Sequence, residues 1–219
     1  MTTGGYLSNA WKSKWRAGVF IVLGLTIALG GAACGGAPKT YYYTLQPPAT
    51  PTPNDPRTEY TLGVEHFRSP VILRDDRILY YISPTQVNYY EHHRWGSDPA
   101  TLLSEYSARW LESTGVFAEV RMLPVRDRVD YTLTGRLLNF EEVDTGGAPK
   151  ARVVLELSLI RTIDRKRVWS GEQRQEQPIS ERGVEGVATA LNSASSQVLQ
   201  AMIPDLLARV EQDFKNRGK

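Results

Sequence analysis

The sequence has only one cysteine, Cys34, among its 219 residues. A single cysteine excludes an internal disulfide and any cysteine-rich zinc site. An excess of charge of one sign is also missing from most of the chain. The first 33 residues hold three bases and no acid, whereas residues 34–219 hold 23 basic and 24 acidic side chains. A dedicated nucleic-acid-binding protein carries a basic face on its folded part, so we expect no nucleic-acid partner.

Catalytic sequence motifs are absent as well. The G-x-S-x-G, Walker A, G-x-G-x-x-G and H-E-x-x-H patterns do not occur. His92 and His93 are adjacent and would point to opposite sides of an extended chain, so they are poorly placed to share a metal ion. Together with His66, they are interpreted as solvated loop histidines. Two acidic pairs are interpreted as charges at turns and strand ends: Asp75-Asp76 and Glu141-Glu142. We therefore expect no enzymatic activity, no metal site and no cofactor.

Long hydrophobic runs are lacking too. The uncharged run Ala17–Leu29 has 13 residues, and a membrane-spanning helix needs about 20. A cationic stretch precedes this run and small residues follow it up to Cys34, which is typical of a secretory signal. The sequence therefore predicts a signal peptide over residues 1–33. An uncleaved signal anchor and a secreted protein with an incidental cysteine are the alternatives.

Ala32 and Ala33, directly before Cys34, resemble the lipobox of bacterial lipoproteins, although Gly31 stands where that pattern prefers leucine. The resemblance implies that the signal is cut before Cys34 and that lipid is attached to this cysteine. Two or three acyl chains would hold the protein on a membrane essentially permanently. The resemblance also implies a position on the periplasmic side of the cell envelope. In enteric bacteria, an aspartate directly after the cysteine resembles a signal to stay in the inner membrane. Because Gly35 stands at this position, we expect the outer membrane rather than the inner one.

The remainder of the chain is predicted to be a short tether followed by one domain. Residues 34–40 form the tether, residues 41–213 the domain, and residues 214–219 a polar tail. Five prolines between residues 46 and 57 exclude a strand or a helix interior there and predict an extended surface loop.

Periodicity predicts the elements of this domain. Strands are expected over residues 41–45, 60–64, 77–82, 86–90, 116–123, 130–143, 153–159 and 168–177, with a bulge near Leu137. One helix follows a cap at Ser97 or Asp98 and ends at Gly115. A second helix, capped by Ser180, should kink or restart at Pro204. Hairpin connections favour an α+β fold with two layers, in which a mostly antiparallel sheet carries both amphipathic helices on one face.

Aromatic residues are concentrated between residues 80 and 95. Neighbouring tyrosines on a strand face opposite ways, so some of these rings should be exposed, which favours a binding surface. We predict partner contacts at Tyr89, Tyr90 and Trp95, although burial of Trp95 under the first helix is an equal alternative. The basic cluster Arg165–Arg167 is interpreted as a hairpin tip rather than as a contact to lipid headgroups.

Three short segments look like the family of ABC-type transport auxiliary lipoproteins: residues 42–45, 89–95 and 167–170. The resemblance implies a fold like the N-terminal domain of the translocation protein TolB. It also implies a non-catalytic accessory role, with the membrane and the Mce-domain protein of a permease and ATPase complex as partners in lipid transport. Another envelope interaction or assembly lipoprotein, such as an activator of cell-wall synthesis, is the alternative.

Overall fold

A computed structural model describes residues 37–47 and 57–217. The predicted signal peptide, Cys34 and most of the proline-rich loop lie outside the described residues. The chain divides into two units, Met1–Lys39 and Thr40–Lys219, and every element below belongs to the second. Within the described ranges, no helix combines the length and the apolar character that crossing a bilayer requires.

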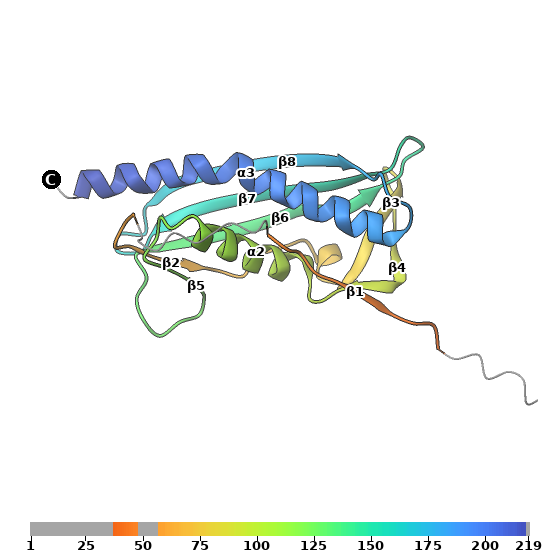
Figure 1. The fold of residues 1–219 in the computed structure, drawn as a ribbon, viewed down its shortest axis with the longest axis horizontal. Helices are drawn as coiled ribbons and strands as arrows, with labels where there is room; N and C mark the ends of the chain where they lie inside the picture. The colour runs from red at the N-terminus through yellow and green to blue at the C-terminus, as the bar shows by residue number, and fades with distance from the viewer. Residues whose placement is uncertain (1–36, 48–56, 218–219) are drawn as a thin grey trace, which may run out of the picture. The chain divides into compact units, whose positions relative to one another are not determined.

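The described part of the second unit contains one eight-stranded sheet and two α-helices, which both lie on the same side of the sheet (Figure 1). The α+β class is therefore confirmed. In chain order the elements are β1 (Tyr41–Tyr43), β2 (Thr61–Val64), the 3-10 helix η1 (Val71–Leu73), β3 (Arg77–Ser83), β4 (Gln86–Trp95), α2 (Pro99–Ser113), β5 (Glu119–Met122), β6 (Tyr131–Val143), β7 (Lys150–Arg161), β8 (Arg167–Pro178) and α3 (Val184–Arg217).

Strand β6 organises the sheet. One of its edges pairs with β7, which pairs with β8. Its other edge pairs with β2 near its start and with β3 near its end. Strand β5 lies outside β2, while β4 and then β1 lie outside β3. Strands β1 and β4 therefore reach the end of the sheet where β6 finishes.

The sheet is mixed, which corrects the prediction of a mostly antiparallel one. The hairpin pairs β3–β4, β6–β7 and β7–β8 are antiparallel as expected. The pairs β1–β4, β2–β5, β2–β6 and β3–β6 are parallel. Local turn signals indicate hairpins, but they carry no information on strands that meet across long connections, and these are the parallel pairs. The likeness to the TolB domain stays a prediction.

The hydrophobic core lies between the sheet and the helices. Alternate residues of β7 are buried, as the period-two pattern predicts, and they join side chains from both helices in one cluster. Burying each such side chain contributes about 1.5–3 kcal/mol relative to leaving it exposed. Its members include Val153, Leu155, Leu157, Leu159, Leu103, Leu111, Leu191, Val198 and Leu206.

The ends of α2 follow its sequence signals. Asp98 is the N-cap, and its carboxylate accepts a hydrogen bond from the backbone N–H of Thr101 at 3.1 Å. Pro99 occupies the first turn, where its missing N–H costs nothing. Gly115 follows the helix with a φ of 61°, a left-handed conformation that glycine adopts without steric cost. The predicted start and stop are confirmed.

Helix α3 differs from its prediction at both ends. It starts at Val184, after Gly183 with its φ of 83°, so Ser180 is not its cap. It continues through Pro204 to Arg217 as one helix of 34 residues, although Figure 1 shows it changing direction partway along its length. The predicted polar tail thus begins within this helix.

Candidate functional site

The three residues predicted to bind a partner lie in three different environments. Trp95 is 1% exposed and packs edge-on against Tyr43 and Phe140, with ring centroids 6.2 and 5.2 Å away. Of the two predicted alternatives for Trp95, exposure or burial, the structure shows burial. Its ring therefore takes no part in the exposed surface described below.

Tyr89 is half-buried beside η1. Its hydroxyl donates a hydrogen bond to the carbonyl oxygen of Ile72 at 2.9 Å, and the Arg77 guanidinium lies over its ring at 4.6 Å. Burial raises the pKa of its phenol, so the hydroxyl keeps its proton as a donor. The neighbouring Val71 is 76% exposed, which makes this part of the surface partly apolar.

An irregularity in β4 places Tyr90. Leu79 pairs with Tyr89, whereas Arg77 pairs with Arg94, so two steps along β3 correspond to five steps along β4. The additional residues break the strict alternation of side chains between the two faces. As a result, the Tyr90 and His93 rings meet edge-on at 6.1 Å although they are three residues apart.

Five rings form a continuous row across β3, β4 and β1, which we call the aromatic row: Tyr80, Tyr90, His93, Tyr41 and Tyr43. Tyr80 and Tyr90 are 4.6 Å apart, and His93 stacks on Tyr41 at 5.1 Å and on Tyr43 at 5.8 Å. Because His92 and His93 belong to β4, their interpretation as solvated loop histidines is corrected. The sequence gives no sign that β1 pairs with β4, and this pairing assembles the row.

Hydrogen bonds hold two tyrosines of the row, Tyr43 and Tyr90, in place. The Tyr43 hydroxyl lies 2.8 Å from Nδ1 of His93 and donates to Oε1 of Glu185, in α3, at 3.3 Å. Burial and Glu185 raise the pKa of Tyr43 to about 12. Next to Tyr80 in the row, the Tyr90 hydroxyl donates to Oε2 of Glu142 at 2.7 Å, and burial and this carboxylate raise the pKa of Tyr90. The rings are thus held in place by protonated phenols.

The acidic pair at residues 141 and 142 lies near the end of β6, as predicted, but it is buried. Glu141 is 1% exposed and accepts hydrogen bonds from Nε of Arg152 at 2.6 Å and from the backbone N–H of Phe140 at 2.6 Å. Burial raises the pKa of Glu141 despite these donors. Its oxygens are engaged by the protein itself, which makes this ion pair part of the packing rather than a reactive group.

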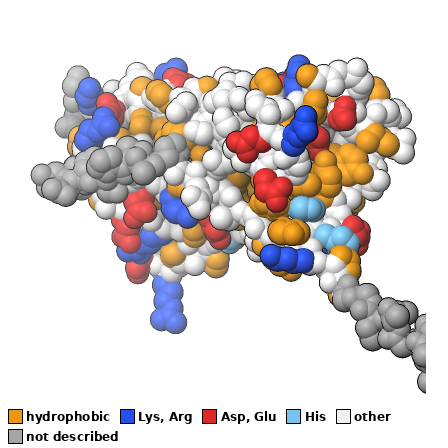
Figure 2. All heavy atoms as spheres, turned by 45° about the vertical axis from the view of Figure 1, so that its right-hand side comes forward, with side chains coloured by type: hydrophobic (Ala, Val, Ile, Leu, Met, Phe, Trp, Pro, Cys, Tyr) orange, Lys and Arg blue, Asp and Glu red, His pale blue; other side chains and the backbone are white. Residues whose placement is uncertain are grey.

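Strand β1, the outermost strand, carries two exposed rings. Tyr42 is 67% and Tyr41 is 41% exposed. Figure 2 shows the histidine side chains bordered by hydrophobic ones on this part of the surface. Beside Tyr43, a groove lies between the segment after β1 and the start of α3, lined by Thr44, Gln46, Glu185 and Asn192 among others. In the described part of the chain, no group of three or more His, Cys, Asp or Glu side chains is placed to hold a metal ion.

The described residues thus combine a mixed sheet with an exposed aromatic surface at one end of it. The sequence model of the family of ABC-type transport auxiliary lipoprotein components matches residues 43–203. The chain therefore belongs to this family, which confirms the resemblance seen in its short motifs.

Two solved structures are similar to the chain in fold. The crystal structure of protein XCC0632 from Xanthomonas campestris is 25% identical with a TM-score of 0.71, over 80% of this chain and 99% of that one. A crystal structure of an uncharacterized protein is 18% identical with a TM-score of 0.60, over 77% and 99% of the two chains, and shares the fold. No curated protein matches the chain.

Proposed function

We propose that the protein is a lipid-anchored, periplasmic and non-catalytic accessory component of an ABC-type lipid transport system that contains an Mce-domain protein. The observation that supports this proposal is the family match over residues 43–203, which runs from the end of β1 into α3. The match therefore includes the whole sheet apart from its first residues, and both helices up to Pro204.

Anchoring is the first part of the proposal. The only cysteine follows an apolar run and small residues, the arrangement of a lipoprotein signal. Acylation of Cys34 would hold the domain at the periplasmic surface, with the outer membrane favoured. Mass spectrometry of the membrane-extracted protein should find a lipid-bearing amino terminus at residue 34. An intact segment before Cys34 on the mature protein would contradict this part.

Partner contact is the second part. Tyr89 and Tyr90 are the half-buried tyrosines of β4 that remain candidates for touching the Mce-domain protein. Tyr89 has the stronger structural support, because exposed Val71 lies beside it and widens the apolar surface. Interface centres are enriched in tyrosine and depleted of charged residues, which this surface matches in part.

Photocrosslinking tests this contact. The full-length protein carrying a photoreactive amino acid at Tyr89 would be expressed together with the Mce-domain protein, permease and ATPase of a transport system from the same organism, and irradiated in intact membranes. We expect a crosslink to the Mce-domain component. The matched control is the same amino acid at Ile163, which is 66% exposed on the turn between β7 and β8 and should give no such crosslink. Crosslinks from residue 89 to a cell-wall synthase, with none to a transport component, would instead favour the alternative of an envelope assembly lipoprotein.

A further inference from the structure

We propose that the rim of the sheet formed by Tyr41 and Tyr42 rests on the lipid bilayer and sets the orientation of the domain on its membrane. This inference rests on the proposed anchoring at Cys34 and adds a second, non-covalent membrane contact. The binding partner of the rim is a lipid surface, which the aromatic rings contact at the level of the headgroups.

The chemistry of the rim suits the membrane interface. A tyrosine has an apolar ring and a polar hydroxyl, and this residue type is enriched where membrane meets water. Tyr42 is 67% exposed and Tyr41 is 41% exposed, although an isolated globular domain gains nothing by presenting two adjacent large rings to water. Contact with headgroups and the first methylenes would remove part of this apolar area from water.

The position of β1 in the sheet allows both rings to reach the same surface. Neighbouring residues of a strand project to opposite faces, so Tyr41 and Tyr42 flank the strand on its two sides. Strand β1 is outermost in the order β1-β4-β3-β6. When the outer edge of the sheet faces a membrane, rings from both of its faces therefore meet that membrane together.

The rim is also preorganised. Tyr41 stacks on His93 at 5.1 Å, and His93 is itself linked to Tyr43 through a 2.8 Å contact between Nδ1 and the hydroxyl. Tyr43 is tied to α3 through Glu185. Because these contacts already fix the ring of Tyr41, little side-chain entropy is lost when it meets the lipid.

The tether brings this rim, rather than another part of the domain, to the membrane. Residues 35–40 number six between Cys34 and β1, and they span at most about 20 Å at ~3.3 Å per residue. Strand β1 is thus confined near the bilayer once Cys34 is acylated. A short tether raises the effective concentration of the rim at the membrane to the millimolar range. Two rings are then sufficient to keep the rim in contact with the bilayer, although an unanchored domain would bind vesicles only weakly through them.

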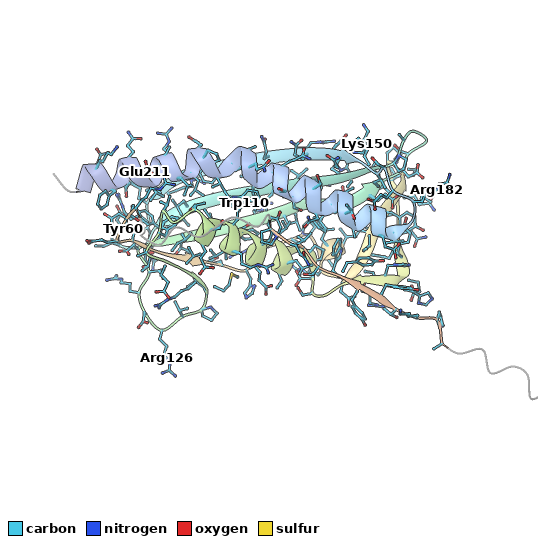
Figure 3. All side chains as sticks on the ribbon, viewed as in Figure 1. Tyr60, Trp110, Arg126, Lys150, Arg182 and Glu211 are labelled. Atoms are coloured by element: carbon cyan, nitrogen blue, oxygen red, sulfur yellow. The ribbon has the colours of Figure 1, made fainter. Side chains whose placement is uncertain are left out.

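The opposite end of the domain provides an internal control. Arg126 lies on the loop between β5 and β6 and points away from the domain (Figure 3). That loop leads into the start of β6, whereas β3 pairs with residues 142 and 143 at its end. The 13 residues of β6 separate the two ends by about 40 Å at ~3.3 Å per residue.

The experiment measures immersion of the rim in vesicles that contain no transporter. Full-length, processed protein is reconstituted in phosphatidylcholine vesicles with a polarity-sensitive fluorophore on a single introduced cysteine, Tyr42→Cys or Arg126→Cys. A nitroxide on the lipid headgroup serves as a contact quencher. We expect at least threefold stronger quenching at residue 42 than at residue 126, unchanged in 0.5 M salt because the rings carry no charge. Equal quenching at the two residues would overturn the proposal.

A second variant separates ring contact from mere proximity. Tyr41→Ser in the Tyr42→Cys background removes the neighbouring ring and leaves the tether intact. Quenching at residue 42 should fall by at least half, and undiminished quenching would show that the tether alone places the label near lipid, which also overturns the inference.

Vesicle flotation distinguishes failure of the proposed anchor from failure of the proposed rim contact. Protein that does not float lacks the proposed anchor, and the inference falls with it, whereas protein that floats with a water-exposed label at residue 42 contradicts the inference alone.

Discussion

Trp95 in β4 and Tyr42 in β1 lie on paired strands, but the first is buried in the core and the second is exposed. Trp95 packs between Tyr43 and Phe140, while Tyr42 projects into solvent. Trp95→Ala should lower the free energy of unfolding by about 3–5 kcal/mol, because it leaves a cavity in the core. Tyr42→Ala should change it by less than about 0.5 kcal/mol. Urea denaturation of the chain from residue 35 onward measures both, and a Trp95→Ala effect as small as that of Tyr42→Ala would contradict the core assignment.

The ion pair of Glu141 and Arg152 predicts a stability change that depends on pH. Burial raises the pKa of Glu141 in the folded state, so its ionised form is the costly one and its contribution to stability falls as the pH rises through that pKa. Arg152→Met removes the cation 2.6 Å from Oε1 and leaves a buried carboxylate without its partner. This loss should cost about 3–5 kcal/mol at neutral pH and much less near pH 4, where Glu141 is protonated.

The double variant Glu141→Gln with Arg152→Met is the control for this prediction. It has no carboxylate at residue 141, so its stability relative to the parent chain should lack the additional loss at neutral pH. Denaturation midpoints at pH 4 and pH 7.5 report both proteins. An Arg152→Met effect of equal size at the two pH values would show that packing rather than charge explains the loss.

At the scale of single elements, α2 depends on its cap. The Asp98 carboxylate accepts from the Thr101 backbone N–H at 3.1 Å and from the Thr101 hydroxyl at 2.7 Å. Asp98→Ala should destabilise the domain by about 1 kcal/mol, within the usual range for a lost N-cap. Asp98→Asn keeps an acceptor oxygen and should cost clearly less. Thermal melts of the two variants test the order, and equal losses would assign the effect to charge rather than to capping.

The same helix shows which elements a sequence can predict. The cap, the proline of the first turn and the glycine after α2 are local signals, and in the structure each occurs at the position that the sequence predicts. The bulge predicted near Leu137 is also present, as a register shift between Leu137 and Asn139. In β4, by contrast, the irregularity between Tyr89 and Arg94 breaks the alternation on which a strand prediction depends.

Contacts between segments far apart in the chain could not be predicted from the sequence either, because they depend on strand pairing and not on local patterns. The aromatic row requires β1 to pair with β4, fifty residues further along the chain in the contact of Tyr43 with His93. The burial of Glu141 similarly requires Arg152 on the neighbouring strand. No local pattern specifies these neighbours, so the sequence predicted an aromatic surface but left exposure and burial of Trp95 as equal alternatives, and it did not place Tyr41 and His93 among the candidates.

At the scale of the whole molecule, the tether and the rim act together. The proposed lipid anchor would fix where the chain leaves the membrane, and the exposed rings of β1 would fix which side of the domain faces it. A partner that contacts Tyr89 would then approach along the membrane, because β4 lies directly inside β1 in the sheet. Under the proposed function, this placement is what the domain would contribute to the transport system.

Lengthening the tether tests this cooperation. Inserting about 24 Gly and Ser residues after Gly36 extends the six-residue segment to about 30 residues, and effective concentration falls roughly with the −3/2 power of length, which predicts about a tenfold drop. Because the ring of Tyr41 and the label that replaces Tyr42 bind lipid only weakly, quenching at residue 42 should fall markedly while the protein still floats with its vesicles. The same number of residues added after Lys219 should leave the quenching unchanged. Full quenching with the long tether would mean that the rim binds the bilayer strongly by itself and that the short tether has no part in orienting the domain.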